Sequence, residues 1–211
     1  MNNYIASRYD LFLNDLETVV NIDSGTHFIQ GVERVITYFE ERFSALQWYP
    51  QRHQFPGEVG PCLEVSNIHP SSEQGTYDIL CLGHVDTVFQ EGTAQARPFS
   101  IIGDRGMGPG VIDMKAGLVA ILHVAETLQE FGIAEKLSIC IAFNSDEETG
   151  SGASRAWIEA LARRSKRVFI FEYCRPGGHH VLQRKGIGGY QIFCYGKAAH
   201  AGVEPEKGIN A

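Results

Sequence analysis

Two absences in this sequence narrow what the chain can bind. It has no basic excess, because 18 lysine and arginine residues stand against 25 acidic residues and give a formal net charge of -7. Nucleic-acid-binding proteins usually present a basic face, so the sequence argues against a nucleic-acid partner. It also contains no apolar run close to the roughly 20 residues that a membrane-spanning helix needs, so we expect no membrane partner.

The cysteine pattern is equally sparse. The 5 cysteines include no C-x-x-C pair, and their number is odd. This argues against a disulfide framework and against a thiolate zinc site, and it fits a reducing compartment. The first ten residues show no basic segment followed by an apolar run, which predicts the absence of a signal peptide. We therefore expect a cytoplasmic protein.

Hydrophobic periodicity predicts alternating helices and strands. Helices are expected over residues 4–20, 29–46, 114–131 and 153–164. Strands are expected over 48–54 and 61–68, and three short apolar runs predict buried strands at Ile79–Leu82, Leu137–Phe143 and Val168–Phe171. This alternation predicts an α/β fold with a mixed central sheet flanked by helices.

The character of the sequence changes near residue 186. Glycines precede an alternating segment over 189–195, which predicts a strand, and residues 205–211 resemble the beginning of a helix. We therefore expect a first domain over 1–185 and the opening of a second over 186–211. Because a domain that stops one turn into a helix is unfinished, we expect the chain to be truncated at its C-terminal end.

Polar residues follow one expected buried strand and precede the clearest helix. His84 comes just after Ile79–Leu82, and Asp86 could accept a hydrogen bond from its ring and fix the tautomer. A strand-capping histidine with a turn-forming aspartate would give the same pattern. Asp113 follows a glycine-rich loop and precedes the helix, where it serves either as a metal ligand or as an N-cap.

Acidic residues follow the other two expected buried strands. The run Asp146–Glu148 follows Leu137–Phe143, and Glu172 follows Val168–Phe171. Such runs are usually solvated, but carboxylates crowded at the carboxyl end of a central strand cost free energy unless a cation offsets their charge. Sites in open α/β sheets form beyond these strand ends, so the polar clusters should converge on one rim. One histidine with several carboxylates suits zinc, and a shared aspartate suits a two-metal hydrolase.

Four ordered motifs resemble those of the di-zinc aminoacylase / glutamate carboxypeptidase family. Residues 82–88 (LGHVDTV) resemble its first signature, 108–117 (GPGVIDMKAG) its second and 146–151 (DEETGS) its third. Residues 196–202 (GKAAHAG) resemble the start of its lid domain. The resemblance covers nearly all of the chain from about residue 75 onward. It implies a zinc aminopeptidase-like catalytic domain followed by the beginning of a small α+β lid and dimerisation domain.

The resemblance also implies a set of metal ligands. His84 and Glu172 resemble ligands of the first zinc, Glu148 resembles a ligand of the second, and Asp113 resembles the aspartate that bridges both ions. The implied cofactor is Zn²⁺, two ions per active site in the complete enzyme, with Co²⁺ or Mn²⁺ as alternatives. The family's last zinc ligand is a histidine far toward the C-terminus, and this chain ends before it.

Three further residues carry implied catalytic roles. Glu147 resembles the general base that takes a proton from water, and Asp86 resembles the partner that orients His84. His200 resembles a lid residue that reaches the active site of the partner subunit and helps to stabilise the oxyanion, so the resemblance implies a homodimer. Tyr173 and Cys174 stand where relatives often have proline and a small residue; Cys174 either lies near the metals or is a buried, inert thiol.

Within the family, residues 89–99 and 183–189 look most like glutamate carboxypeptidases. The implied substrate is a small N-acyl amino acid or peptide-like molecule from which a C-terminal glutamate is removed. An N-acetyl amino acid deacetylase is the nearest enzyme alternative, and an inactive fragment that binds one metal weakly is the non-catalytic alternative. A phosphate-binding protein would rest on the glycine loop alone, and Asp113 and the acidic run argue against it.

Overall fold

The computed structural model describes most of the chain and divides it into two compact units. The units are Met1–Tyr173 and Cys174–Ala211. The described residues are 1–69, 71, 75–175, 177–179, 181, 183, 185–186 and 188–210. The domain boundary expected near residue 186 stays a prediction.

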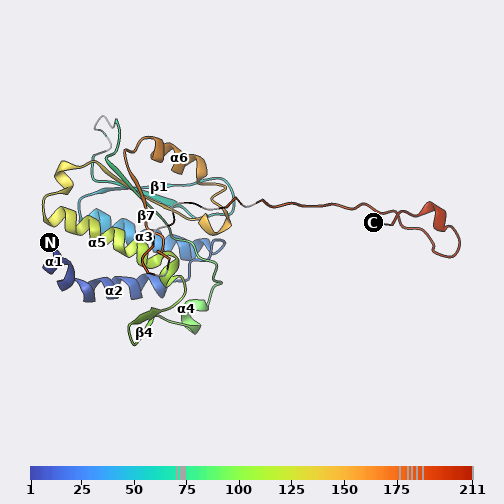
Figure 1. Cartoon of the computed structure of the whole chain (residues 1–211), viewed down its shortest axis with the longest axis horizontal. Helices are drawn as coiled ribbons and strands as arrows, with labels where there is room; N and C mark the ends of the chain where they lie inside the picture. Colours follow the sequence, from blue (N-terminus) through green and yellow to red (C-terminus); the bar gives the residue numbers. More distant parts are fainter. Residues whose placement is uncertain are drawn as a thin grey trace. The chain divides into compact units, whose positions relative to one another are not determined.

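A five-stranded mixed sheet forms the centre of Met1–Tyr173 (Figure 1). In spatial order its strands are β1 (Tyr49–His53), β2 (Cys62–Ser66), β6 (Ile139–Asn144), β3 (Ile79–His84) and β7 (Val168–Ile170). Strand β3 pairs in parallel with both β6 and β7, whereas β1 and β2 extend the sheet by antiparallel pairing. The mixed sheet and its flanking helices confirm the α/β fold expected from the sequence.

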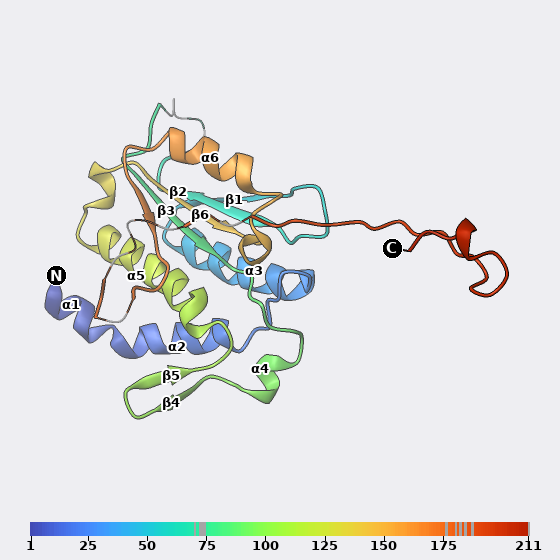
Figure 2. The same ribbon diagram turned by 45° about the vertical axis from the view of Figure 1, so that its right-hand side comes forward.

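Helices cover both faces of this sheet (Figures 1 and 2). The helices are α1 (Asn2–Ser7), α2 (Tyr9–Val20), α3 (Ile29–Ala45), α4 (Thr93–Ala96), α5 (Ala116–Glu130) and α6 (Arg155–Arg163). Helices α3 and α5 pack on one face, and α6 packs on the other. The helix expected over 4–20 is interrupted at Arg8. Among the described residues, no helix combines the length and the apolar character needed to cross a membrane.

Most of the hydrophobic core lies between the sheet and helices α3 and α5. The apolar residues of α3 recur at helical spacing, so one face of the helix is buried. From this face, the ring centroids of Phe39 and Phe43 lie 5.0 and 6.2 Å, respectively, from the ring centroid of Phe143 in β6. On the other face, Leu161 of α6 packs with Leu80 of β3 in a smaller cluster. Both layers hold β3 and β6 rigidly, and these are the strands that lead into the polar rim.

Three short elements were not expected from the sequence. These are α4 and a two-stranded hairpin formed by β4 (Ser100–Ile102) and β5 (Arg105–Met107). Short 3-10 segments also span Ala134–Lys136 and Glu147–Thr149. Strands of three residues give too little alternation to be detected from their sequence pattern.

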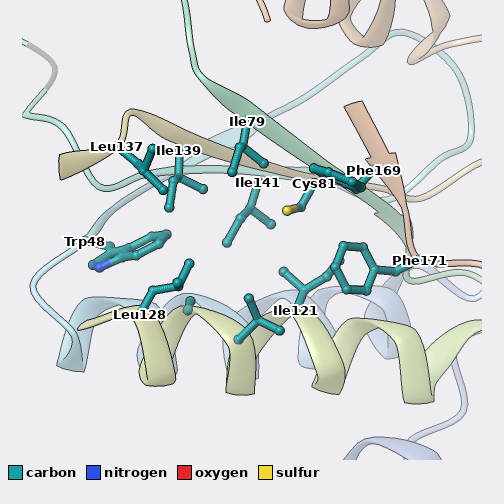
Figure 3. Close-up of a pocket in the computed structure, with 12 residues that line it drawn as sticks. Trp48, Ile79, Cys81, Ile121, Leu128, Leu137, Ile139, Ile141, Phe169 and Phe171 are labelled. Carbon is teal, nitrogen blue, oxygen red and sulfur yellow. The ribbon is translucent and has the colours of Figure 1, made fainter. Parts of the chain in front are cut away.

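The sequence prediction of a buried strand is correct for β3 and β6 and wrong for β7. The side chains of Val168, Phe169 and Ile170 are 40%, 49% and 65% exposed. Strand β7 lies at the edge of the sheet and pairs with β3 on one side only. Beside it, Phe169 and Phe171 line an apolar cavity of about 300 Å³ between the sheet and α5 (Figure 3). Apolar composition alone does not reveal whether a strand is central or at an edge.

In the unit Cys174–Ala211, the strand expected over 189–195 is also wrong. These residues form no strand, and the side chains of Tyr190 and Ile192 are 94% and 85% exposed. A strand needs a hydrogen-bonded neighbour, and the described residues of this unit supply only isolated bridges, such as the one between Lys197 and Ile209.

The end of this unit carries less helix than the sequence pattern suggests. A 3-10 helix spans Pro205–Lys207 where a longer helix was expected to begin. Ala211 lies outside the described residues, as do Arg184 and Ile187 from the segment that resembles glutamate carboxypeptidases.

Candidate metal centre

Three parallel strands bring their carboxyl ends to one rim of the sheet. His84 is the last residue of β3 and lies opposite Asn144, the last residue of β6. The loop after β6 carries Glu147, and Glu172 stands two residues beyond the end of β7. Asp113 reaches the same rim from the irregular π-helical segment Val111–Lys115, which directly precedes α5. This convergence is the one expected for an open α/β sheet.

Carboxylates surround the buried imidazole of His84. Its side chain is 1% exposed, and its Nε2 atom lies 3.1 Å from Oδ1 of Asp113, 3.3 Å from Oε1 of Glu172 and 3.8 Å from Oε2 of Glu147. Among the described residues, the potential ligand atoms of His84, Asp113 and Glu172 lie within 4.8 Å of one another. One imidazole and two carboxylates at this spacing can share a divalent cation.

The other ring nitrogen of His84 fixes the tautomer. Its Nδ1 atom lies 2.9 Å from the backbone oxygen of Asp86 and 3.3 Å from Oδ1 of the same residue. Both neighbours are acceptors, so Nδ1 carries a hydrogen and donates it. In a neutral imidazole the lone pair is then on Nε2, which faces Asp113 and Glu172. Metal-binding histidines are commonly oriented by such a contact.

The electrostatics of the rim favour an added positive charge. Burial alone would lower the pKa of His84, but its contacts with the carboxylates of Asp86 and Glu172 raise that pKa to about 11. Partial burial raises the pKa of Glu147, and the negative charges of Glu172 and Asp86 act in the same direction against the opposing effect of His84. Burial also raises the pKa of Glu148. A proton or a cation therefore relieves the repulsion among these carboxylates.

A close backbone approach brings Asp113 next to Glu172. A Cβ atom added at Gly117, in the first turn of α5, would lie 2.1 Å from the backbone oxygen of Phe171. Only glycine allows α5 to start this near the end of β7. The backbone N–H of His84 also donates to Sδ of Met114 at 3.1 Å, and the peptide bond between Asp113 and Met114 is cis. Gly117, the last glycine of the second motif, thus has a packing function.

The three residues of the acidic run have different environments. Asp146 is 1% exposed and accepts hydrogen bonds from the backbone N–H of Ala153 at 2.8 Å and from the hydroxyl of Ser154 at 2.5 Å. Asp146 therefore stabilises the loop, and the expectation that an acidic run is solvated is wrong for this residue. Glu147 and Glu148 donate their backbone N–H groups to the two carboxylate oxygens of Asp86, each at 3.1 Å.

The structure thus brings together part of the expected site. The potential ligand atoms of His84, Asp113 and Glu172 lie close together, and Glu147 and Asp86 lie beside the histidine. Among the described residues, Glu148 does not belong to the 4.8 Å set, His200 belongs to the unit Cys174–Ala211, and Cys174 is exposed. The ligand roles of His84, Asp113, Glu148 and Glu172 stay predictions, as do the catalytic roles of Asp86, Glu147 and His200.

Sequence reasoning overlooked one residue at this rim. Thr26 is 5% exposed, and its hydroxyl donates a hydrogen bond to Oδ2 of Asp86 at 2.8 Å. The two residues are 60 positions apart in the sequence. A single threonine in an N-terminal loop carries no local signal of such a contact.

Comparison with known proteins agrees with this geometry. The family described as Peptidase family M20/M25/M40 matches residues 80–204, which is more than half of the 211 residues. The chain belongs to this family. It is 34% identical over 200 residues to carboxypeptidase G2 of Pseudomonas sp. (strain RS-16), a match that covers 94% of this chain and 48% of that protein. The chain therefore spans about half the length of this M20 relative.

A second curated relative and two solved structures extend the likeness. The chain is 34% identical over 122 residues to succinyl-diaminopimelate desuccinylase of Pseudomonas fluorescens, covering 54% of this chain and 31% of that protein. Human carnosine dipeptidase 1 matches with a TM-score of 0.68 at 16% identity, over 82% of this chain and 40% of that one. The M20 metallo-carboxypeptidase Sso-CP2 from Sulfolobus solfataricus matches with a TM-score of 0.62 at 19% identity, over 79% of this chain and 38% of that one. These structures support the M20 fold.

Membership in the M20 family implies the use of a divalent metal ion, and the residues present fit one. The nitrogen and oxygen donors of His84, Asp113 and Glu172 suit zinc and related first-row ions. The contact between Nδ1 of His84 and Asp86 leaves Nε2 directed at the two carboxylates, which is the arrangement that a shared cation needs.

Proposed function

We propose that this chain forms the metal-binding part of a zinc-dependent hydrolase that cleaves the amide bond of N-acyl amino acids or releases a C-terminal glutamate. The observation that carries the proposal is the buried Nε2 atom of His84, which has carboxylate oxygens of three residues within 3.8 Å. The likeness to carboxypeptidase G2 supports a carboxypeptidase activity. Because the chain spans about half of that relative, the activity is proposed for the complete protein.

In this proposal each residue at the rim has a distinct task. His84, Asp113 and Glu172 would hold one divalent ion, and Asp113 and Glu148 would contribute to the binding of a second. When bound, such ions supply Lewis acidity that polarises a carbonyl group and makes a neighbouring water molecule more acidic. Asp86 keeps Nδ1 of His84 protonated, so that Nε2 stays available as a ligand.

Glu147 is the proposed proton carrier. Its side chain is 49% exposed, so water and substrate can reach it, and its Oε2 atom is 3.8 Å from Nε2 of His84. Partial burial and the neighbouring carboxylates raise the pKa of Glu147, which brings its basicity closer to that needed near neutral pH. Its carboxylate accepts a proton from the attacking water and delivers it to the departing amine.

The proposal extends to residues and properties outside the rim. His200 would donate a hydrogen bond to the oxyanion that forms from the substrate carbonyl. In this account it acts from the lid of one subunit in the site of another, so the complete protein is a homodimer. Zinc as the native ion, rather than Co²⁺ or Mn²⁺, and a cytoplasmic location belong to the same proposal.

Substitution of Glu147 tests the reaction. In the complete protein, Glu147→Gln should lower hydrolysis of an N-acyl glutamate by roughly 10²–10⁴-fold, because the general base is lost. Zinc content should stay unchanged, because Glu147 is not a ligand in this account. Glu130→Gln, at the end of α5, is the matched control and should retain full activity. Equal activity of the Glu147→Gln variant and wild type would contradict the proposed role.

A deacylase of the same family is the second candidate. The 34% identity to succinyl-diaminopimelate desuccinylase favours it, because that relative's name describes removal of an acyl group. Parallel assays with N-acyl glutamates and with N-acetyl derivatives of other amino acids separate the two. Preference for glutamate across acyl groups supports the carboxypeptidase, and preference for one acyl group across amino acids supports the deacylase. No hydrolysis of either series by the zinc-loaded complete protein would favour a non-catalytic product.

A further inference from the structure

The carboxylate of Asp86 contacts rim residues that follow β6 as well as the histidine that ends β3. Its side chain is fully buried, and its Oδ1 atom accepts the backbone N–H of Glu147 at 3.1 Å and lies 3.3 Å from Nδ1 of His84. Its Oδ2 atom accepts the backbone N–H of Glu148 at 3.1 Å and the hydroxyl of Thr26 at 2.8 Å. Thr26 makes the shortest of these contacts, and it comes from the loop between α2 and α3.

The backbone around Thr26 is fixed independently of its side chain. The N–H of Thr26 donates to the backbone oxygen of Thr87 at 3.2 Å, and the N–H of Thr87 donates to the oxygen of Ser24 at 2.9 Å. Gly25 packs so tightly that an added Cβ atom would lie 2.3 Å from the backbone oxygen of Phe89. The backbone that carries the Thr26 hydroxyl is therefore held by its contacts with Thr87 and Phe89.

A buried lysine connects the same loop to the segment that carries Asp113. The side chain of Lys115 is 1% exposed, and its Nζ atom donates to the backbone oxygen of Ile22 at 2.6 Å. The loop over residues 22–26 thus touches the Asp113 segment through Lys115 and the β3 end through Thr87 and Asp86.

We propose that Thr26 is a positioning residue of the metal centre, which sets the orientation of the Asp86 carboxylate. This inference rests on the proposed function, because it gives Thr26 its effect through the ligand His84. A carboxylate can rotate about its last bond, since that torsion has a broad energy profile. The hydroxyl of Thr26, together with the backbone N–H of Glu148, restricts this rotation by holding Oδ2, and the other oxygen then stays beside Nδ1 of His84. The same constraint aligns the imidazole ring of His84 and the backbone of Glu147 and Glu148.

Removing the hydroxyl while keeping the shape of the side chain tests this role. Thr26→Val should weaken Co²⁺ binding about 10–100-fold, which is the usual effect of losing a group that orients a metal ligand. It should also alter the visible absorption spectrum of bound Co²⁺. In the metal-free protein, the amide proton and nitrogen signals of Glu147 and Glu148 should move, because both groups donate to Asp86. Thr26→Ser retains a hydroxyl and should restore all three properties.

Thr127→Val is the matched control. Thr127 is also buried, at 7% exposed, and its hydroxyl donates to the backbone oxygen of His123 within α5. This variant loses a comparable hydrogen bond far from Asp86, so it should bind Co²⁺ like wild type with unchanged Glu147 and Glu148 signals. If Thr26→Val fails to fold by circular dichroism, Thr26→Ala takes its place.

Two results would overturn the inference. One is wild-type Co²⁺ affinity together with unmoved amide signals in Thr26→Val; the other is the same loss of affinity in Thr127→Val, which would indicate general instability. If wild type itself binds no Co²⁺, the proposed function fails. The amide signals of the metal-free proteins then still decide whether Thr26 orients Asp86.

Discussion

The Nε2 atom of His84 lies 3.1 Å from Oδ1 of Asp113, although the two residues are 29 positions apart and belong to different elements. One ends β3 and the other precedes α5. Their approach depends on the packing of α5 against the sheet, and the site can therefore be perturbed from positions that touch no ligand.

Gly117→Ala should disturb the site through packing alone. The new Cβ atom would lie 2.1 Å from the backbone oxygen of Phe171, so either α5 or the end of β7 must move. We expect a loss of about 1–3 kcal/mol in the free energy of unfolding and weaker zinc binding, because Asp113 and Glu172 move apart. Chemical denaturation and a zinc competition titration measure the two effects.

Gly152→Ala provides the control for that experiment. An added Cβ atom at Gly152 would meet no heavy atom within 4 Å. The free energy of unfolding should change by less than about 0.5 kcal/mol, and zinc affinity should stay the same. Equal behaviour of the two variants would show that the approach of Gly117 to Phe171 does not constrain the site.

Asp146→Asn should loosen the loop that carries Glu147 and Glu148. The buried carboxylate accepts the N–H groups of Ala153 and Ser154, at 2.8 and 3.2 Å, and an amide replaces a charged acceptor with a weaker one. Hydrogen–deuterium exchange measured by mass spectrometry should become faster over residues 147–154 and remain unchanged in α3. Unaltered exchange over that loop would mean that Asp146 does not brace it.

Stability in acid should depend on Asp15, which lies far from the metal rim. Burial would raise the pKa of its carboxyl group, but hydrogen bonds from His123, Arg42 and Tyr38 hold that pKa well below its usual range. Because the pKa is lower in the folded state than in the unfolded state, this contribution is fully present above about pH 4. It is lost as the pH falls from there toward the folded-state pKa.

Asp15→Asn should therefore cost about 1–3 kcal/mol in the free energy of unfolding at pH 7, and the difference from wild type should shrink below about pH 4. Urea denaturation at a series of pH values measures the difference. Asp104→Asn is the control, because the Asp104 side chain is 97% exposed. A difference that stays constant down to the lowest pH would contradict this assignment.

The sequence predicted the fold and the position of the rim because these depend on local patterns. Short apolar runs gave β3 and β6, and the polar residues at their ends met at one rim, as the topology of parallel strands requires. The exposure of β7 could not be predicted, because it depends on which elements cover a sheet edge. The expected strand over 189–195 was wrong because alternation of side chains does not supply a pairing partner.

Within the site, residues that the motifs singled out lie close together, whereas contacts between distant segments were not predicted. His84, Asp113 and Glu172 could be identified by their places after strands or before a helix. Thr26 could not, because its contact with Asp86 joins segments 60 positions apart. The different environments of Asp146 and Glu147 were likewise hidden, since adjacent acidic residues look alike in a sequence and differ only in what surrounds them.

The zinc affinity of the purified chain, compared with that of Asp113→Ala, tests the central claim most directly. A chelator competition titration gives the affinity, and elemental analysis gives the zinc content. Asp113→Ala should lose more affinity than the roughly 10–100-fold that follows removal of an orienting residue, and the exposed-site control Asp104→Ala should bind like wild type. Zinc binding by Asp113→Ala that equals wild type would contradict the assignment of His84, Asp113 and Glu172 as a metal centre.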